Sequence, residues 1–533
     1  MLSHVQFLSP ADAVSRIPDG ATVAIGGTGP SLEADAVLQA LQERFVQTAS
    51  PRNLTVFAPA LPGDRAGIGG LNCIAHEGLL ARMIGASFSS SRHPALIEMI
   101  RNEACEGYVI GMGTLVQLLD AAASGKPGVH TTVGIGSFLD PRNEAGRMNA
   151  RSRDTMAQVT EVAGKEYLFY PTHHIDVAII RGTTADENGY ISFEEEPNTL
   201  AMLELASATK ACGGLVIAQV KRLARANSLD PKLVRIPGPL VDVVVVNPAQ
   251  TQVSSQMFDP ALGANPALSG SLKVPLHRLP RLEDPMLRVM MRRAALELRP
   301  NDVINIGVGV ATSLPSIALE EGILDDLTFT NEHGIFGGIF TSVLGKSFVP
   351  ALNADAIMDS SFQFGFYESG GLSVTFLGIG EIDAAGHVNV SKFGREWNGC
   401  GGFNSITDRT SRLVFCGSLT TGGLQVAVED GELRIVREGR HKKFVNRVEQ
   451  VTLNATRARK QGQQVLYITE RAVFELGDDG PVVIEIAPGI DFDRDIQDQV
   501  GFELKKSPAL KRMDSRIFQE PAMGLLDTFV ASC

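Results

Sequence analysis

The sequence has little that would indicate a metal-binding, disulfide-bonded or membrane protein. Its six cysteines, among 533 residues, include no C-x-x-C pair, so neither a zinc site nor a disulfide framework is predicted. No apolar run reaches the length of a membrane-spanning helix, and the first residues lack the basic patch and apolar stretch of a signal peptide. We therefore expect a cytoplasmic protein with no membrane partner and no resident metal.

Positive charge is also scarce. The net charge is −12, the pI is about 5.4, and no basic domain or stripe stands out, which argues against nucleic acid as a partner. An acidic protein can still bind an anionic ligand through helix N-termini and main-chain N–H groups. A small-molecule ligand is therefore the simpler expectation.

The chain repeats one pattern. Asp19–Arg44 reads as a strand, a glycine turn and a helix, and Asp302–Glu321 follows the same plan. The turn at Asp186–Ser192 recurs within Gly378–Ser391. Strands that alternate with helices predict parallel sheets. We therefore expect an α/β fold of two related open domains with mostly parallel sheets and a ligand cleft between them.

Composition sets the expected boundaries between these halves. A chain of 533 residues is too long for one core. The residues from 247 to 285 are rich in Ser, Pro, Gln and Gly. We predict an N-terminal domain over 1–250, a linker over 251–285 and a C-terminal domain over 286–533. The tail from Asp491 is expected to be helical and exposed.

Glycines Gly26, Gly27 and Gly29 follow the first strong strand. Such a turn can present main-chain N–H groups to an anion or a carbonyl oxygen. It is not a P-loop, because no G-K-[ST] follows, and it is not a clean G-x-G-x-x-G either. Close packing of strand on helix explains the same glycines equally well.

The stretch LTFTNEHGIFGG, Leu327 to Gly338, is expected to be a short buried strand that ends at Glu332. Ligands gather at the carboxyl ends of parallel strands. A carboxylate there, with glycines after it, can meet a substrate. A hydrogen-bonded Glu in a tight turn is the other interpretation.

A second glycine cluster, GCGGF, covers Gly399 to Phe403. Without side chains, main-chain N–H groups can approach a ligand oxygen closely and form an oxyanion hole. A glycine bend under close packing is the alternative, with equal weight.

These stretches, together with GGLNCIAHEGLLARMIGA, RGTTADENGYISFEEE and GEIDAAGHVNVSKFG, resemble class I coenzyme A transferases. The resemblance is to the single-chain acetate, propionate or 3-ketoacid type with fused α and β halves, and it spans most of the chain. It implies that Glu332 is the catalytic nucleophile. It also implies that Gly401 and Gly402, with Gly399 beside them, contribute to the oxyanion and CoA-binding site.

One stretch departs from the family pattern. Relatives often carry a P-Q-G-T-like segment whose Gln donates to the oxyanion, but here it reads Gly111, Met112, Gly113, Thr114. Met112 has no such donor. Met112 and the turn glycines Gly26, Gly27 and Gly29 are therefore kept as possible substrate-loop residues.

The resemblance implies transfer of CoA from an acyl-CoA to a short-chain carboxylic acid by double displacement. The intermediates would be an acyl-glutamyl anhydride and a glutamyl-CoA thioester. CoA would be a substrate, no cofactor would be tightly bound, and the protein would be a homodimer or homotetramer. An acyl-CoA hydrolase on the same scaffold and a non-enzymatic ligand-sensing domain are the alternatives.

Overall fold

The computed structural model describes residues 5–63, 67–253, 264–279, 281–340 and 350–532. The chain forms two compact units, and each contains an extended sheet. Unit 1 consists of Met1–Lys273, Ile357–Gly365 and Arg395–Ser405, and unit 2 of Val274–Ala356, Phe366–Gly394 and Ile406–Cys533. The division predicted from composition stays a prediction. It differs from these units mainly in two short segments of the second half that group with unit 1.

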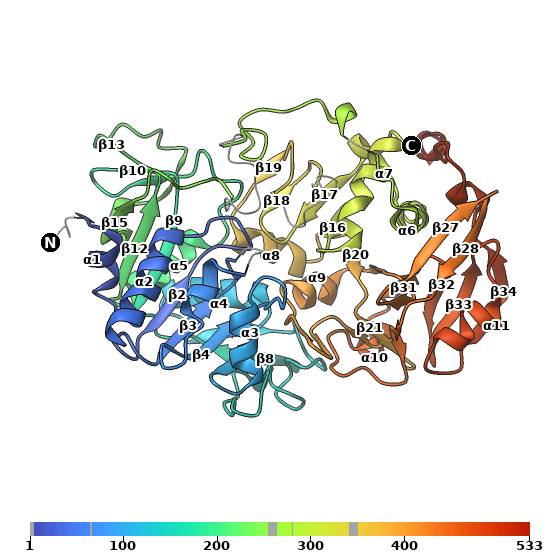
Figure 1. Ribbon diagram of the computed structural model, residues 1–533, viewed down its shortest axis with the longest axis horizontal. Helices are drawn as coiled ribbons and strands as arrows, with labels where there is room; N and C mark the ends of the chain where they lie inside the picture. The colour runs from blue at the N-terminus through green and yellow to red at the C-terminus, as the bar shows by residue number, and fades with distance from the viewer. Residues whose placement is uncertain (1–4, 64–66, 254–263, 280, 341–349, 533) are drawn as a thin grey trace. The chain divides into compact units, whose positions relative to one another are not determined.

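The sheet of unit 1 has eight strands, and all neighbouring pairs run parallel. Its inner strands are almost continuously apolar, as expected where helices cover both faces of a parallel sheet. In spatial order the strands are β1 (Gln6–Phe7), β15 (Val243–Val246), β12 (Leu215–Val220), β9 (Val177–Arg181), β2 (Thr22–Ile25), β3 (Leu54–Ala58), β4 (Leu80–Gly85) and β5 (Glu106–Val109) (Figure 1).

Helices connect these strands. They are α1 (Pro10–Val14), α2 (Asp35–Thr48), α3 (Pro94–Arg101), α4 (Met112–Ala123) and α5 (Met202–Ala211). The connections β2–α2–β3 and β9–α5–β12 run in opposite directions across the sheet. Since such crossovers are right-handed, α2 and α5 cover opposite faces. The junction of β2 and β9 is therefore the topological switch point, beside which ligands usually bind.

The sheet of unit 2 has ten strands with a parallel centre; antiparallel pairs flank this centre, and the last pair is parallel again. In spatial order they are β19 (Ala356–Ile357), β18 (Ile335–Phe336), β17 (Thr328–Asn331), β16 (Val303–Ile306), β20 (Val374–Gly378), β25 (Arg412–Cys416), β31 (Gln464–Ile468), β32 (Ala472–Gly477), β33 (Gly480–Ile486) and β34 (Lys505–Arg512) (Figure 1). The main helices are α6 (Pro285–Ala295), α7 (Leu314–Glu320), α8 (Ser360–Glu368), α9 (Phe403–Arg409), α10 (Ala455–Lys460), α11 (Phe492–Asp495) and α12 (Leu525–Ser532). Of these, α8 and α9 begin in the segments that group with unit 1.

The predicted internal repeat is confirmed by the topology. The order β15-β12-β9-β2-β3 in unit 1 matches β31-β25-β20-β16-β17 in unit 2. Each unit also carries an antiparallel hairpin at the matching place in the chain. In unit 1, β10 (Thr184–Asp186) and β11 (Ile191–Ser192) follow β9; in unit 2, β21 (Glu381–Asp383) and β22 (Val388–Asn389) follow β20. The two units are therefore related open α/β folds, and the switch point of unit 2 lies between β16 and β20.

The helical prediction for the tail is wrong. From Asp491 to Asp514 the chain makes the four-residue helix α11, a 3-10 turn at Gln497–Gln499 and then β34, which pairs in parallel with β33. The charged run that includes Lys505 and Lys506 is typical of an exposed edge strand, because charges on an edge discourage pairing with another sheet. Residues 254–263 and 280 of the predicted linker lie outside the described residues.

Candidate active site

Glu332 begins the turn that joins β17 to β18. The two strands pair antiparallel, with Thr330 opposite Phe336 and Asn331 opposite Ile335, so Glu332–Gly334 form a three-residue loop. Gly334 has φ +86°, the left-handed conformation that such a loop takes at its last position. The side-chain oxygen of Asn331 accepts the N–H of His333 at 3.0 Å and tightens the turn. The predicted strand and its end at Glu332 are confirmed.

The carboxylate of Glu332 stands at the carboxyl end of a parallel pair, because β17 runs parallel to β16. Its side chain is 20% exposed, and its Oε1 lies 4.0 Å from Nε2 of the buried His333. The Glu332 side chain is therefore partly buried and partly exposed at the end of the strand.

The glycines after Glu332 serve packing. Gly338 has φ +80°, and a Cβ there would lie 2.3 Å from the carbonyl oxygen of Leu352. Gly337 has φ +74°, and its N–H donates to Phe329 O at 2.7 Å. These two positions therefore require glycine so that the chain can turn back against β17.

The glycine loop at Gly399 lies at the carboxyl ends of β4 and β5, within unit 1. Gly399 bridges to Ser87, and the N–H groups of Cys400 and Gly401 both donate to Ala86 O, at 3.0 and 2.8 Å. Gly399 has φ +67°, and its Cβ would lie 2.9 Å from that same oxygen. The loop is thus held against the strand end by main-chain contacts that only glycine permits.

Met112 is brought to this loop. Its N–H, the first of helix α4, donates to the carbonyl oxygen of Gly401 at 2.9 Å, and its side chain is buried. The structure therefore places Gly399, Gly401 and Met112 together, and gives Met112 a main-chain role in holding the loop. Because Gly401 N–H already donates to Ala86, an oxyanion that used it would have to share or replace that bond.

The turn of Gly26, Gly27 and Gly29 lies at the same edge of unit 1, after β2. At Gly27, φ is +112° and a Cβ would lie 2.8 Å from the main-chain oxygen of Leu32, so close packing accounts for this glycine; at Gly26 a Cβ would lie 2.5 Å from Sδ of the flexible Met202 side chain. Gly29 N–H donates to Leu61 O at 2.9 Å.

Gln219, on β12, is a further polar residue at this edge of unit 1 that no sequence motif indicated. Its side-chain oxygen accepts the N–H groups of Ala36 and Val37, at 2.9 and 3.4 Å, at the start of α2. An anion at this helix start would have to displace that amide. The available signal was a fully buried Gln inside the apolar strand LVIAQV, because a buried amide requires partners.

The aromatic residues of α8 differ in exposure. Phe364 and Tyr367 are fully buried, which supports a core role for both, whereas Phe362 is 53% exposed. The ring of Phe366 lies 5.5 Å from that of Phe336 on β18, centroid to centroid. This pair packs α8 onto the strand that follows the Glu332 turn.

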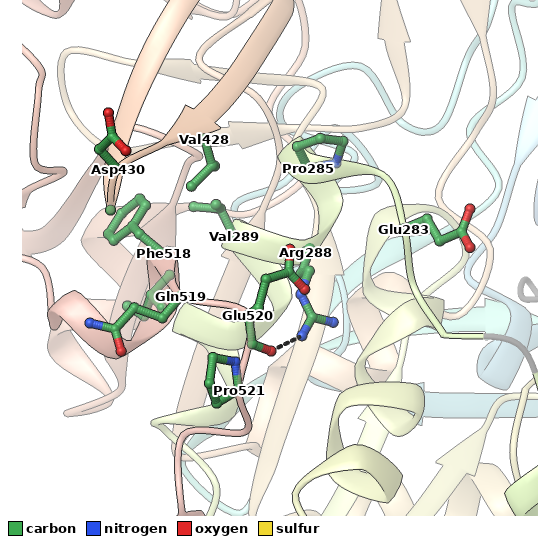
Figure 2. Close-up of a pocket in the computed structure, with 12 residues that line it drawn as sticks. Glu283, Pro285, Arg288, Val289, Val428, Asp430, Phe518, Gln519, Glu520 and Pro521 are labelled. Atoms are coloured by element: carbon green, nitrogen blue, oxygen red, sulfur yellow. Dashed lines mark hydrogen bonds between the residues drawn. The ribbon is translucent and has the colours of Figure 1, made fainter.

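Unit 2 also contains a pocket of about 460 Å³ between the start of α6, the tip of the hairpin β27 (Gln425–Glu429) and β28 (Glu432–Arg437), and residues 517–521. Figure 2 shows Phe518 and Val428 on one side of it, and the Arg288 guanidinium donating to the main-chain oxygen of Glu520 at 3.4 Å. Among the described residues, those that line it include neither Glu332 nor any of the predicted glycines.

Comparison with known proteins decides the family. Residues 7–247 match the family model described as coenzyme A transferase. The chain is 40% identical over 525 residues to acetate CoA-transferase YdiF of Escherichia coli K12, covering 98% of this chain and 97% of that protein. The chain belongs to the coenzyme A transferase family. This CoA-transferase is also 41% identical to caffeate CoA-transferase of Acetobacterium woodii, with 98% of both chains covered.

A solved structure shows that the fold agrees over the whole chain. The acyl-CoA transferase YdiF of E. coli O157:H7, crystallised as a thioester complex with CoA, superposes with a TM-score of 0.91. Sequence identity is 38%, and 98% of each chain is covered. The single-chain arrangement predicted from the sequence is therefore confirmed, and the protein is an enzyme that transfers CoA. Within the described part of the chain, no helix combines the length and apolarity needed to cross a bilayer.

Proposed function

We propose that this CoA-transferase moves CoA from an acyl-CoA to a short-chain carboxylic acid, of the acetate, propionate or 3-ketoacid type, through Glu332. The observation that carries the proposal is the position of Glu332 in a tight turn at the carboxyl end of β17, partly buried and partly exposed. The similar YdiF enzyme was crystallised as a thioester complex with CoA, which supports a covalent route for this chain.

The route begins with attack of the Glu332 carboxylate on the thioester carbonyl. An acyl-glutamyl anhydride forms, and the C–S bond breaks to release CoA thiolate. The thiolate then attacks the glutamyl carbonyl of the anhydride, which gives a glutamyl-CoA thioester and the free donor carboxylate. The acceptor carboxylate reverses both steps. A carboxylate suits this chemistry because its thioester is as activated as the substrate, whereas a serine ester would not be.

Each tetrahedral intermediate carries an oxyanion that main-chain N–H groups can stabilise, by about 3 kcal/mol for one well-placed donor. As the family resemblance implies, this contact is assigned to the glycine loop at Gly401 and Gly402; at Gly401 the oxyanion would share or replace the N–H bond to Ala86 O. Gly399 shapes the loop through its left-handed conformation.

The resemblance also supports a cytoplasmic homodimer or homotetramer that uses CoA as a substrate without a tightly bound cofactor. Similar enzymes are named for acetate and for caffeate. The acceptor should therefore be identified with a panel that contains acetate, propionate, a 3-ketoacid and an aromatic acid.

The test replaces Glu332 by Gln and measures the exchange of CoA between labelled acetate and acetyl-CoA. Loss of the nucleophile should lower the rate by at least roughly a thousandfold. Asp325→Asn is the matched control, because Asp325 is an exposed carboxylate just before the amino end of the same strand; it should keep the rate within about twofold. Exchange by Glu332→Gln above a tenth of the wild-type rate would refute the proposal.

A further inference from the structure

A row of polar side chains crosses the centre of the unit 2 sheet. Asn305 on β16 is the register partner of Thr330 on β17 and of Thr375 on β20. Register partners in a parallel sheet point to the same face. All three side chains are fully buried, and the row spans the switch point between β16 and β20.

The hydroxyl of Tyr367, on α8, joins the row. Asn305 Nδ2 donates to Tyr367 Oη at 3.2 Å, Tyr367 Oη donates to Thr330 Oγ1 at 2.9 Å, and Thr330 Oγ1 donates to Ile304 O at 2.9 Å. At the other end of the row, Thr375 Oγ1 donates to Asn305 Oδ1 at 3.2 Å. Thr375 Oγ1 also lies 3.3 Å from the main-chain oxygen of Asn305. The donor chain that reaches β17 therefore runs from Asn305 Nδ2 through Tyr367 Oη and Thr330 Oγ1 to Ile304 O.

The related sheet of unit 1 shows that the fold does not require this polar row. The repeat places Ala24 where Asn305 stands, and the register partners of Ala24 are Phe57 and Ala178. Those three residues are buried and apolar. A buried polar network is stabilising only when all its members are satisfied, so an apolar row is the simpler way to build this sheet. The polar version occurs in the unit that carries Glu332.

We propose that the Tyr367 hydroxyl is a positioning group for Glu332. It fixes the side chain of Thr330, two residues before Glu332, to α8 and to β16, and so sets the strand end from which the carboxylate projects. The proposal rests on the role of Glu332 proposed above. A nucleophile held in this way attacks from one orientation, and small displacements lower the rate of attack.

The test is Tyr367→Phe, which keeps the ring and removes the hydroxyl. The readouts are the single-turnover rate of CoA attachment to the enzyme and KM for acetyl-CoA. We expect the attachment rate to fall roughly ten- to a hundredfold while KM changes by less than about twofold, because no group that binds CoA has been removed.

Tyr467→Phe is the matched control. Tyr467 lies on β31 of the same sheet, is equally buried, and donates its hydroxyl to Gly386 O at 2.6 Å. Its variant should lose comparable thermal stability and keep the attachment rate within about twofold. Equal rates in the two variants would overturn the proposal.

A second pair decides the matter if Tyr367→Phe does not fold. Thr330→Val removes the hydroxyl that accepts from Tyr367, and Thr330→Ser keeps it. A slowed Val variant with a Ser variant near the wild-type rate supports the proposal, and equal rates overturn it. Failure of the proposed function is distinct, because wild-type enzyme would then carry no CoA on Glu332.

Discussion

Gly399→Ala tests the glycine loop through a contact that the structure specifies. Gly399 has φ +67°, and a Cβ there would lie 2.9 Å from Ala86 O and 3.0 Å from Ser87 Cα. Both are main-chain atoms at the end of β4 and cannot rotate away. Gly394 offers a matched control, because its φ is +55° and its Cβ would meet nothing within 4 Å among the described residues. The two variants share a conformational penalty and differ in the steric one.

The magnitudes follow from these two terms. A left-handed conformation costs a non-glycine residue about 1–2 kcal/mol, which is the whole effect expected for Gly394→Ala. The close approach to β4 adds about 1–3 kcal/mol of overpacking at Gly399, so Gly399→Ala should be destabilised by about 2–5 kcal/mol. The loop must also move away from Ala86, which shifts Gly401 and Gly402, so CoA exchange should fall roughly tenfold or more.

The assay is guanidinium unfolding followed by tryptophan emission, together with the exchange rate of each variant. Trp397 is the only tryptophan of the chain and lies between the two glycines; its main-chain N–H donates to Ser90 Oγ at 3.2 Å. Gly399→Ala should unfold at a lower denaturant midpoint than Gly394→Ala and lose exchange, whereas Gly394→Ala should keep it. Equal midpoints, or undiminished exchange by Gly399→Ala, would refute the reasoning.

Two further predictions concern buried charges. Burial raises the pKa of Glu204 from 4.5 to about 7, although a hydrogen bond from Ser361 opposes the shift. The Glu204 carboxyl loses its proton at a lower pH in the unfolded state than in the folded state. The free energy of unfolding should therefore fall by about 3 kcal/mol as pH rises from 4.5 to 7. Glu204→Gln should therefore gain in melting temperature relative to wild type between pH 5 and pH 8, and a constant difference would contradict this. Arg293→Ala leaves the buried Glu485 with one cation among the residues that the structure describes, the ammonium of Lys511 at 3.4 Å. It should lower the unfolding free energy by about 3 kcal/mol, and a calorimetric midpoint within 1 °C of wild type would contradict that prediction.

Patterns that depend on neighbouring residues could be predicted from the sequence. The strand, glycine turn and helix predicted within Asp19–Arg44 are present as β2, residues 26–29 and the start of α2, and the strand before Glu332 ends where expected. In both stretches the apolar run and the following turn residues lie together in the chain. The repeat of the two halves was also visible, because each copy preserves a strand, a glycine turn and a helix.

Features that depend on distant residues could not be predicted. The Gly401 N–H donates to Ala86 O, and these two residues are far apart in the chain. Gln219 caps α2 from a strand that follows it by more than 150 residues, and the polar row at Asn305 is visible only once strand register is known. The tail was misassigned because its charged residues also suit an exposed helix, whereas pairing with β33 makes it a strand.

The most direct test of the central claim is to incubate the enzyme with acetyl-CoA and no acceptor, digest it, and locate the modified peptide by mass spectrometry. The account predicts that the peptide containing Glu332 carries CoA through a thioester, and that hydroxylamine or added acetate removes it. CoA on a different carboxylate, or an enzyme that exchanges CoA while Glu332 stays unmodified throughout the reaction, would contradict it.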